Sequence, residues 1–367
     1  NMINNIIGGD TPDLEDPKIL KDFFSVIQSL NRDNKIMSYH DRSDGGLITS
    51  LVEMCFAGRC GINIDLEEQS SDEIASYLFN EELGAVIQVA DNDLNQVLKK
   101  IEDKLGGYVK QIGKPAINQK ISIKNNNNIV FSETRSKLQS YWTETSFRMQ
   151  SLRDNPQSAL EEFNTISDND DPGISPIIKF DIEKSINIKK TRAKIAILRE
   201  QGVNGHNEMA AAFYYAGFEP HDIHMSDIAS GYKNLDDYQD MAACGGFSFG
   251  DVLGAGQGWA KSILFNQKVK DQFHKFFHNE NTLTLGVCNG CQMLSSIKEI
   301  IPGTDFWPKF IKNESEQFEA RFLSVSIEKT NSPFFEEMEG SILPVVVSKG
   351  EGRVYFIDKN HLNKAIL

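Results

Sequence analysis

Two cysteines lie three residues apart in LGVCNGCQML, residues 285–294. Cys288 stands where an apolar, strand-like run changes to helical spacing, and Gly286 and Gly290 lie two residues to either side. This Gly-x-Cys-x-Gly spacing matches the nucleophile elbow, a strained strand-to-helix turn that exposes the reactive side chain, here with cysteine in place of serine. A helix N-terminus favours the nucleophilic thiolate. The next backbone N–H, that of Asn289, would point to where an oxyanion forms.

The same stretch allows three other interpretations. A Cys-x-x-Cys pair at a strand-to-helix turn is also typical of thioredoxin-like redox proteins. A zinc site is a second possibility, although the buried strand before Cys288 ties that residue to the sheet. Its four ligands would be His274, His278, Cys288 and Cys291. A plain buried cysteine is the third possibility. Local spacing favours the elbow but leaves the other three open.

A glycine cluster, CGGFSFGDVLGAGQG, occupies residues 244–258. Glycines there would let backbone N–H groups approach a ligand closely. Beside an elbow, the amide of Gly246 or Phe247 could supply a second oxyanion donor. An ordinary glycine-rich turn is the alternative. A dinucleotide-binding fingerprint is disfavoured, because residues 254–258 lack the G-x-G-x-x-G spacing.

A short acidic loop, HDRSDGG at residues 40–46, leads into an apolar helix. Asp41 and Asp44 carry the hard oxygen ligands that suit magnesium. Ser43 and the following glycine amides suit a phosphate at a helix N-terminus. The alternative is a capping loop, in which Ser43 or Asp44 is the N-cap residue.

The elements that would position these residues fall into three regions. We expect an α+β part over residues 1–140, a linker over 141–192 and a doubly wound, mostly parallel α/β sheet over 193–367. In the first region the predicted helices are 18–31 and 47–57, and the predicted strands are 61–66, 85–90 and 120–125. The linker is expected because its prolines, acids and amides show little periodicity.

In the third region strand-like and helix-like segments alternate, which is typical of a parallel sheet covered on both faces. The predicted strands are 194–200, 221–226, 241–248 and 282–288. The predicted helices are 207–218, 258–277 as one long amphipathic helix, and 289–300. Ligands on such sheets bind at the carboxyl ends of the strands, where Cys288 is expected. Beyond Arg321 the strands become short and polar, which suggests a mixed edge of the same sheet.

Composition limits the class of protein. The 367 residues are 40% hydrophobic and 25% charged, with a formal net charge of −14. No run of about 18 apolar residues predicts a membrane span, and no signal peptide is predicted. The acidity argues against a nucleic-acid partner. Five cysteines, an odd and small number, suit free thiols in a reducing cytoplasm.

Longer motifs resemble one family. The stretches ILREQGVNGHNEMAAAF, GGFSFGDVLGAGQGWAKSILFN, LGVCNGCQM and NESEQFEARF are similar to the glutaminase domain of large single-chain formylglycinamide ribonucleotide amidotransferases, the phosphoribosylformylglycinamidine synthases. YHDRSDGGL and FNEELGAVIQV resemble the end of the synthetase half of the same enzymes, an α+β domain like the C-terminal domain of aminoimidazole ribonucleotide synthetase. The resemblance covers nearly the whole chain in the right order.

The resemblance implies ATP-dependent amidation of formylglycinamide ribonucleotide in purine biosynthesis, with glutamine as ammonia donor and ATP and Mg²⁺ as cofactors. Cys288 takes the place of the nucleophile, and Gln292 that of a residue contacting the substrate glutamine. Residues 245–247 match the oxyanion loop. Asp41 would be a metal ligand, and Ser43 would touch the nucleotide.

One departure from the family concerns the catalytic base. The family's histidine and carboxylate lie near the C-terminus in a His-Pro-Glu segment that this sequence lacks, so the triad His and Glu are expected outside this chain. His206, with Glu208 two residues later, is expected as a structural residue at the carboxyl ends of the strands, the same rim as Cys288. His278 is expected at the opposite, amino end of the strand that leads to Cys288. We therefore expect a fragment cut at both ends, whose partner is the rest of the same polypeptide. The alternative is a non-catalytic pseudo-glutaminase or scaffold.

Overall fold

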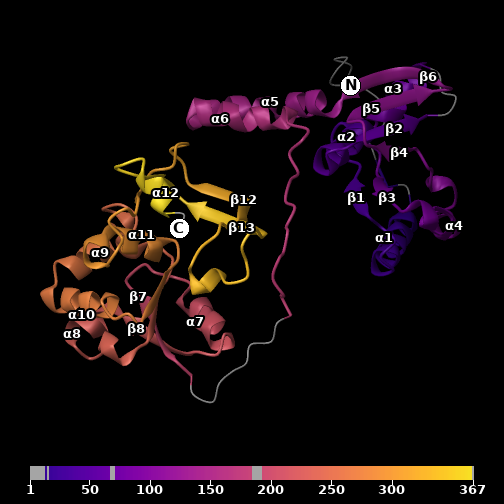
Figure 1. Cartoon of the computed structure of the whole chain (residues 1–367). Helices are drawn as coiled ribbons and strands as arrows, with labels where there is room; N and C mark the ends of the chain where they lie inside the picture. The colour runs from indigo at the N-terminus through magenta and orange to yellow at the C-terminus, as the bar shows by residue number, and fades with distance from the viewer. Residues whose placement is uncertain (1–12, 15, 67–70, 184–191, 366–367) are drawn as a thin grey trace. The chain divides into compact units, whose positions relative to one another are not determined.

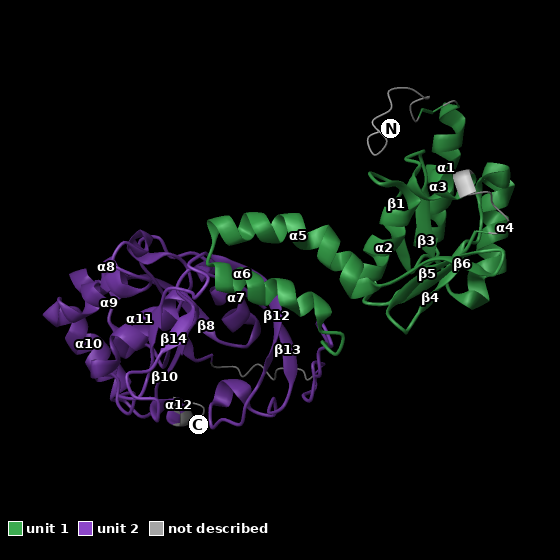
Figure 2. Cartoon of the chain, turned by 90° about the horizontal axis from the view of Figure 1, so that it is seen from above, with its two compact units in different colours: residues 1–171 green, residues 172–367 purple. Residues whose placement is uncertain are grey.

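The computed structural model describes residues 13–14, 16–66, 71–183 and 192–365. The chain divides into two compact units, residues 1–171 and 172–367 (Figure 2). None of the described helices is both long and apolar enough to cross a membrane.

Unit 1 combines helices with two small sheets (Figure 1). Its α-helices are α1 (Pro17–Arg32), α2 (Gly46–Gly58), α3 (Ser71–Phe79), α4 (Leu94–Leu105), α5 (Arg135–Arg153) and α6 (Pro156–Asn164). Its strands are β1 (Ser38–Asp41), β2 (Gly61–Asp65), β3 (Ala85–Gln88), β4 (Gly113–Ala116), β5 (Lys120–Asn125) and β6 (Asn128–Thr134). One sheet has the order β4-β2-β5-β6, and β1 pairs with β3 in antiparallel register. The α+β class predicted for this region is confirmed.

The helices of unit 1 pack through apolar stripes. Val26 and Leu30 of α1 meet Val97 and Ile101 of α4 in one buried cluster. A second cluster joins α2 and α3 to β2 and β5. The acidic loop runs from β1 into α2, so this cluster holds the α2 end of the loop.

Unit 2 is built on a four-stranded parallel sheet of order β10-β9-β7-β8. These strands are β7 (Lys194–Arg199), β8 (Glu219–His224), β9 (Asp240–Ala243) and β10 (Leu283–Gly286). The helices between and after them are α7 (His206–Tyr215), α8 (Met225–Ser230), α9 (Gln257–Leu264), α10 (Gln267–Phe277) and α11 (Asn289–Ser296). The predicted doubly wound fold is confirmed.

Both faces of the central strands β7 and β9 are buried, which explains why these two strands read as mostly apolar runs. Ala196 and Leu198 of β7 pack in a large cluster with α8, α9, α10 and α11. Ile195 and Ile197 point to the other face, where Phe213 of α7 covers them. The carboxyl ends of β9 and β10 therefore reach one rim between the two helical layers.

The C-terminal strands differ from the prediction. Strands β12 (Glu319–Ser326) and β13 (Ile342–Lys349) form one antiparallel pair (Figure 1). Strands β11 (Lys309–Ile311) and β14 (Arg353–Tyr355) form another. Among the described residues neither pair is hydrogen-bonded to the parallel sheet, so the expected mixed edge is wrong. The short helix α12 (His361–Ala365) follows.

The structure also differs from the sequence-based expectation in two helical regions. The single helix expected over 258–277 is two helices, because the Asn266 side chain accepts a hydrogen bond from the Val269 N–H and begins α10 anew. The segment expected to be a linker contains most of α5 and all of α6, and its two helices stack through Phe147 and Phe163. The domain limits 1–140, 141–192 and 193–367 remain a proposal.

Candidate functional site

Cys288 occupies a strained turn between β10 and α11. Its backbone angles are φ 51° and ψ −111°, in a region that favours glycine. Such strain costs on the order of 1–3 kcal/mol and persists only where the surroundings impose it. Cys288 is the N-cap residue of α11, and its side chain makes no capping hydrogen bond. The thiol is thus placed at the carboxyl end of the sheet without being used to cap the helix.

The two glycines near Cys288 are closely packed. A Cβ on Gly290 would lie 2.1 Å from the carbonyl oxygen of Ala243, at the end of β9. A Cβ on Gly286 would lie 2.6 Å from the Leu294 side chain. The contact at Gly290 is with backbone, so the elbow requires glycine there. At Gly286 the end of the Leu294 side chain could shift, and the Cys291 backbone at 3.0 Å leaves only a tight fit.

The glycine-rich loop after β9 lies against the elbow. A Cβ built on Gly245 would be 3.3 Å from the Cβ of Cys288. The Phe247 N–H donates to the Gly202 carbonyl at 2.9 Å, so it is engaged and not free for an oxyanion. Neither the Gly246 nor the Asn289 N–H has a hydrogen-bond acceptor among the described residues. Of the expected oxyanion donors, Gly246 and Asn289 are therefore the two left free.

The side chain of Asn289 fastens this loop to α11. It is almost fully buried, and its Nδ2 donates to Oδ1 of Asp251 at 2.9 Å. Its Oδ1 accepts from the Ser248 N–H at 3.2 Å. The sequence had pointed only to the backbone of Asn289, and it held no signal for Asp251 because that contact depends on how two loops meet.

Gln292 lies one turn into α11, and the residue is 4% exposed. Its Nε2 donates to the backbone carbonyl of Glu351 at 2.7 Å, and its Oε1 accepts from Asn289 at 3.4 Å. In this structure the amide is therefore engaged by protein groups. Glu351 is a second residue of the site that the sequence did not reveal.

Burial protects three of the other thiols, those of Cys291, Cys244 and Cys55. Burial raises the pKa of Cys291, an effect that Lys349 opposes. Burial also raises the pKa of Cys244 to about 11 and that of Cys55 to about 12. All five cysteines are free of disulfides. Because the thiolate is the reactive form, burial makes Cys291 a poor nucleophile.

The histidines do not complete a triad among the described residues. His206 begins α7, and its buried Nδ1 has no hydrogen-bond partner there, so no carboxylate orients that nitrogen as in a triad. His278 is the C-cap residue after α10, and its Nδ1 is hydrogen-bonded to the His274 carbonyl at 2.8 Å. The sequence did not highlight His224. Its Nε2 lies 3.8 Å from Oε1 of Glu200, where β8 and β7 end. In the sheet order β10-β9-β7-β8, His224 is on the edge strand farthest from β10.

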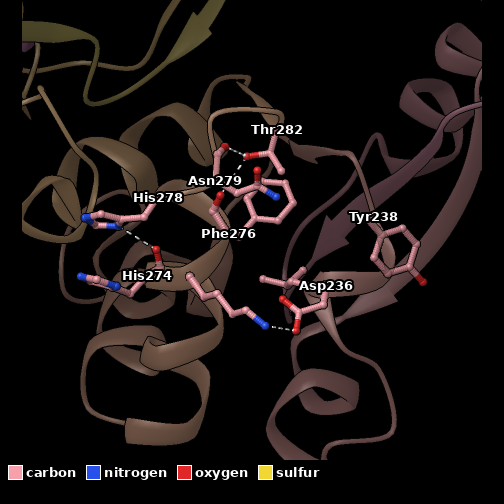
Figure 3. Close-up of a pocket in the computed structure, with 9 residues that line it drawn as sticks. Asp236, Tyr238, His274, Phe276, His278, Asn279 and Thr282 are labelled. Atoms are coloured by element: carbon pink, nitrogen blue, oxygen red, sulfur yellow. Dashed lines mark hydrogen bonds and ion pairs between the residues drawn. The ribbon is translucent and has the colours of Figure 1, made fainter.

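A pocket of about 680 Å³ lies elsewhere in unit 2 (Figure 3). Tyr238 and Thr282 in its lining come just before β9 and β10, so the pocket is at the amino ends of these strands. The rings of His274 and His278 stack there with centroids 3.9 Å apart, and Lys275 pairs with Asp236 at 2.5 Å. Cys288 follows the opposite end of β10, so this pocket is separate from the thiol site.

In the acidic loop of unit 1, backbone N–H groups that the sequence suggested were free are already hydrogen-bonded within the protein. The N-cap of α2 is Gly45, with no side-chain hydrogen bond, so neither Ser43 nor Asp44 caps the helix. The Gly45 N–H donates to Oε1 of Glu81 at 2.8 Å, and the Gly46 N–H donates to the Ser43 carbonyl at 2.9 Å. These two amides are therefore not free to bind a phosphate, while the Ser43 side chain stays exposed.

Asp41 is exposed, and its carboxylate accepts from the Tyr39 hydroxyl at 2.5 Å. The described part of the chain gathers no three His, Cys, Asp or Glu side chains able to hold a metal ion. The described residues thus do not by themselves assemble a magnesium site.

Both parts of the chain match known protein families. Residues 192–366 match the CobB/CobQ-like glutamine amidotransferase domain, and residues 3–123 match the C-terminal domain of AIR synthase related proteins. Residues 192–366 are therefore similar to glutamine amidotransferase domains. With the AIR synthase-related domain ahead of it, this arrangement confirms the resemblance of the chain to formylglycinamide ribonucleotide amidotransferases.

Solved structures show more distant likenesses. The PurLQS structure from Thermotoga maritima is 25% identical, with 46% of this chain and 72% of that chain covered and a TM-score of 0.39. T. maritima PurL complexed with ATP is 17% identical, with 36% and 24% covered and a TM-score of 0.32. Phosphoribosylformylglycinamidine synthase II from T. maritima is 16% identical, with 34% and 22% covered and a TM-score of 0.31. This chain thus spans about a quarter of each of the last two chains, and the domain assignment rests on the family matches.

Proposed function

We propose that this chain is part of an enzyme that amidates formylglycinamide ribonucleotide at the expense of ATP, taking ammonia from glutamine. The observation that carries the proposal is the strained elbow at Cys288, packed against a glycine-rich loop and within a glutamine amidotransferase domain. The identity of the acceptor and the use of ATP come from the resemblance of both parts of the chain to that family.

In the proposed first step, the Cys288 thiolate attacks the side-chain carboxamide carbon of glutamine, and a carbon–sulfur bond forms. The carbonyl oxygen becomes an oxyanion, which the free N–H groups of Gly246 and Asn289 would stabilise. When this intermediate collapses, the carbon–nitrogen bond breaks. The amide nitrogen takes up a proton and leaves as ammonia, and a thioester remains. Water then hydrolyses the thioester to release glutamate and return the thiol.

The proton donor and the base for hydrolysis are not assigned within this chain. None of the described histidines is hydrogen-bonded to Cys288, and we propose that the histidine and its carboxylate belong to the rest of the enzyme. That no described histidine is hydrogen-bonded to Cys288 also favours the second candidate. This is a non-catalytic pseudo-glutaminase, which would only bind and position other parts of the enzyme. The two candidates differ in whether nitrogen moves from glutamine to the acceptor.

Nitrogen transfer tests this proposal in the intact enzyme that contains this chain. With amide-¹⁵N glutamine, formylglycinamide ribonucleotide, ATP and Mg²⁺, we expect ¹⁵N in the amidine product, with one ADP formed per product. Mass spectrometry of the product gives the result. An enzyme that makes the amidine from free ammonia but never from glutamine would support the pseudo-glutaminase, and one that makes no amidine at all would contradict the proposed acceptor.

A further inference from the structure

Glu351 contacts two segments of the thiol site at once. It lies in the short turn between β13 and β14. Its Oε2 accepts from the Ala255 N–H at 2.9 Å, and its backbone carbonyl accepts from Gln292 Nε2 at 2.7 Å. The side chain therefore holds the loop after β9, and the main chain holds the nucleophile helix α11.

The turn that carries Glu351 is itself anchored. Asn313 Nδ2 donates to the Lys349 carbonyl at 2.7 Å, and its Oδ1 accepts from the Gly352 N–H at 2.8 Å. The Asn313 N–H also donates to the Gly350 carbonyl at 3.0 Å. Because three bonds fix the backbone on both sides of Glu351, its carboxylate can hold another segment in place.

The loop on the other side of this contact packs directly on α11. A Cβ on Gly256 would lie 2.5 Å from the Met293 nitrogen, so the loop and the helix touch through their backbones. Asp251 in the same loop accepts from Asn289 at 2.9 Å and from the Gly256 N–H at 3.4 Å. A shift at Ala255 would therefore be transmitted to Asn289, whose N–H is one of the two free oxyanion donors.

We propose that Glu351 is a positioning residue of the glutaminase site, which holds the loop over residues 251–257 and Gln292 in the arrangement that places Cys288 between its oxyanion donors. The inference rests on the proposed function and adds a residue to it. Glu351 acts through hydrogen-bond acceptance and not through its charge, because its side-chain partner is a backbone N–H.

Three substitutions in the intact enzyme test this role. Glu351→Ala removes the acceptor and should lower kcat with glutamine about 10- to 100-fold, since small misplacements of reacting groups cost up to about 10²-fold. The KM for glutamine should change far less than kcat. Glu351→Gln keeps an acceptor oxygen and should stay within about threefold of the wild type, whereas Glu351→Asp is too short and should resemble Glu351→Ala.

Turnover with free ammonia should be unchanged in all three variants, and Glu336→Ala, which removes an exposed carboxylate in the same unit, is the matched control. A normal kcat for Glu351→Ala, an equal loss with ammonia, or a Glu351→Gln variant as slow as Glu351→Ala would each overturn the inference. If the alanine variant does not fold, the glutamine and aspartate variants still decide the matter. A wild type with no glutamine-dependent turnover would instead reject the proposed function itself.

Discussion

Cys288→Ala should abolish glutamine-dependent amidation in the intact enzyme while leaving ammonia-dependent amidation close to the wild-type rate. The thiol is the only group of the elbow that can form the thioester, so we expect a loss on the order of 10⁴-fold or more, as is common when a covalent nucleophile is removed. In the proposed enzyme the ammonia-dependent reaction would use the synthetase part and would need no thiol. Paired assays with glutamine and with ammonium chloride measure both rates.

Cys291→Ala is the matched control for this prediction. Cys291 lies three residues on, in the first turn of α11, and burial raises its pKa, so it should be dispensable for chemistry. We expect it to keep most of the glutamine-dependent rate. Loss of both activities in a folded Cys288→Ala variant would show that the two chemistries are not carried by separate domains.

Gly290→Ala should both destabilise unit 2 and inactivate the thiol site. The new Cβ would be placed 2.1 Å from the Ala243 carbonyl oxygen and 2.4 Å from its carbon, both backbone atoms that cannot move aside cheaply. Overpacking of this kind costs about 1–3 kcal/mol and sometimes more. Urea unfolding followed by tryptophan fluorescence measures the change, because Trp259 is fully buried in the same unit.

Gly350→Ala is the control, because its added Cβ would meet nothing closer than 4.0 Å. It should change the free energy of unfolding by much less than Gly290→Ala. If the two variants unfold at the same urea concentration, then α11 does not pack on β9 as closely as described here.

The elbow could be predicted from sequence because its determinants are local. An apolar strand, a cysteine and glycines at both second neighbours are all visible within a few residues, and the structure places Cys288 in the strained backbone that they suggest. The break at Asn266 also had a local signal, since asparagine is a preferred N-cap. The same holds for α6, where Asn155 caps the helix and Pro156 opens it.

The remaining parts depend on contacts between distant segments. Glu351 meets Ala255 across 96 residues, and Glu81 reaches the Gly45 amide across 36 residues. The local spacing of residue types does not predict either contact. For this reason the sequence suggested free glycine amides before α2 and offered Phe247 as a donor, whereas the structure shows these N–H groups already bonded.

The most direct measurement is to identify the cysteine that reacts with a glutamine-like chloroketone, which carries an α-amino acid end and an electrophilic carbon at the position of the amide. Limited treatment followed by peptide mass spectrometry should place the label on Cys288, with Cys291, Cys244 and Cys55 unmodified, and an excess of glutamine should slow the reaction. Equal labelling of Cys291, or recovery of a Cys288–Cys291 disulfide in place of the labelled thiol, would contradict the assignment of Cys288 as the glutaminase nucleophile.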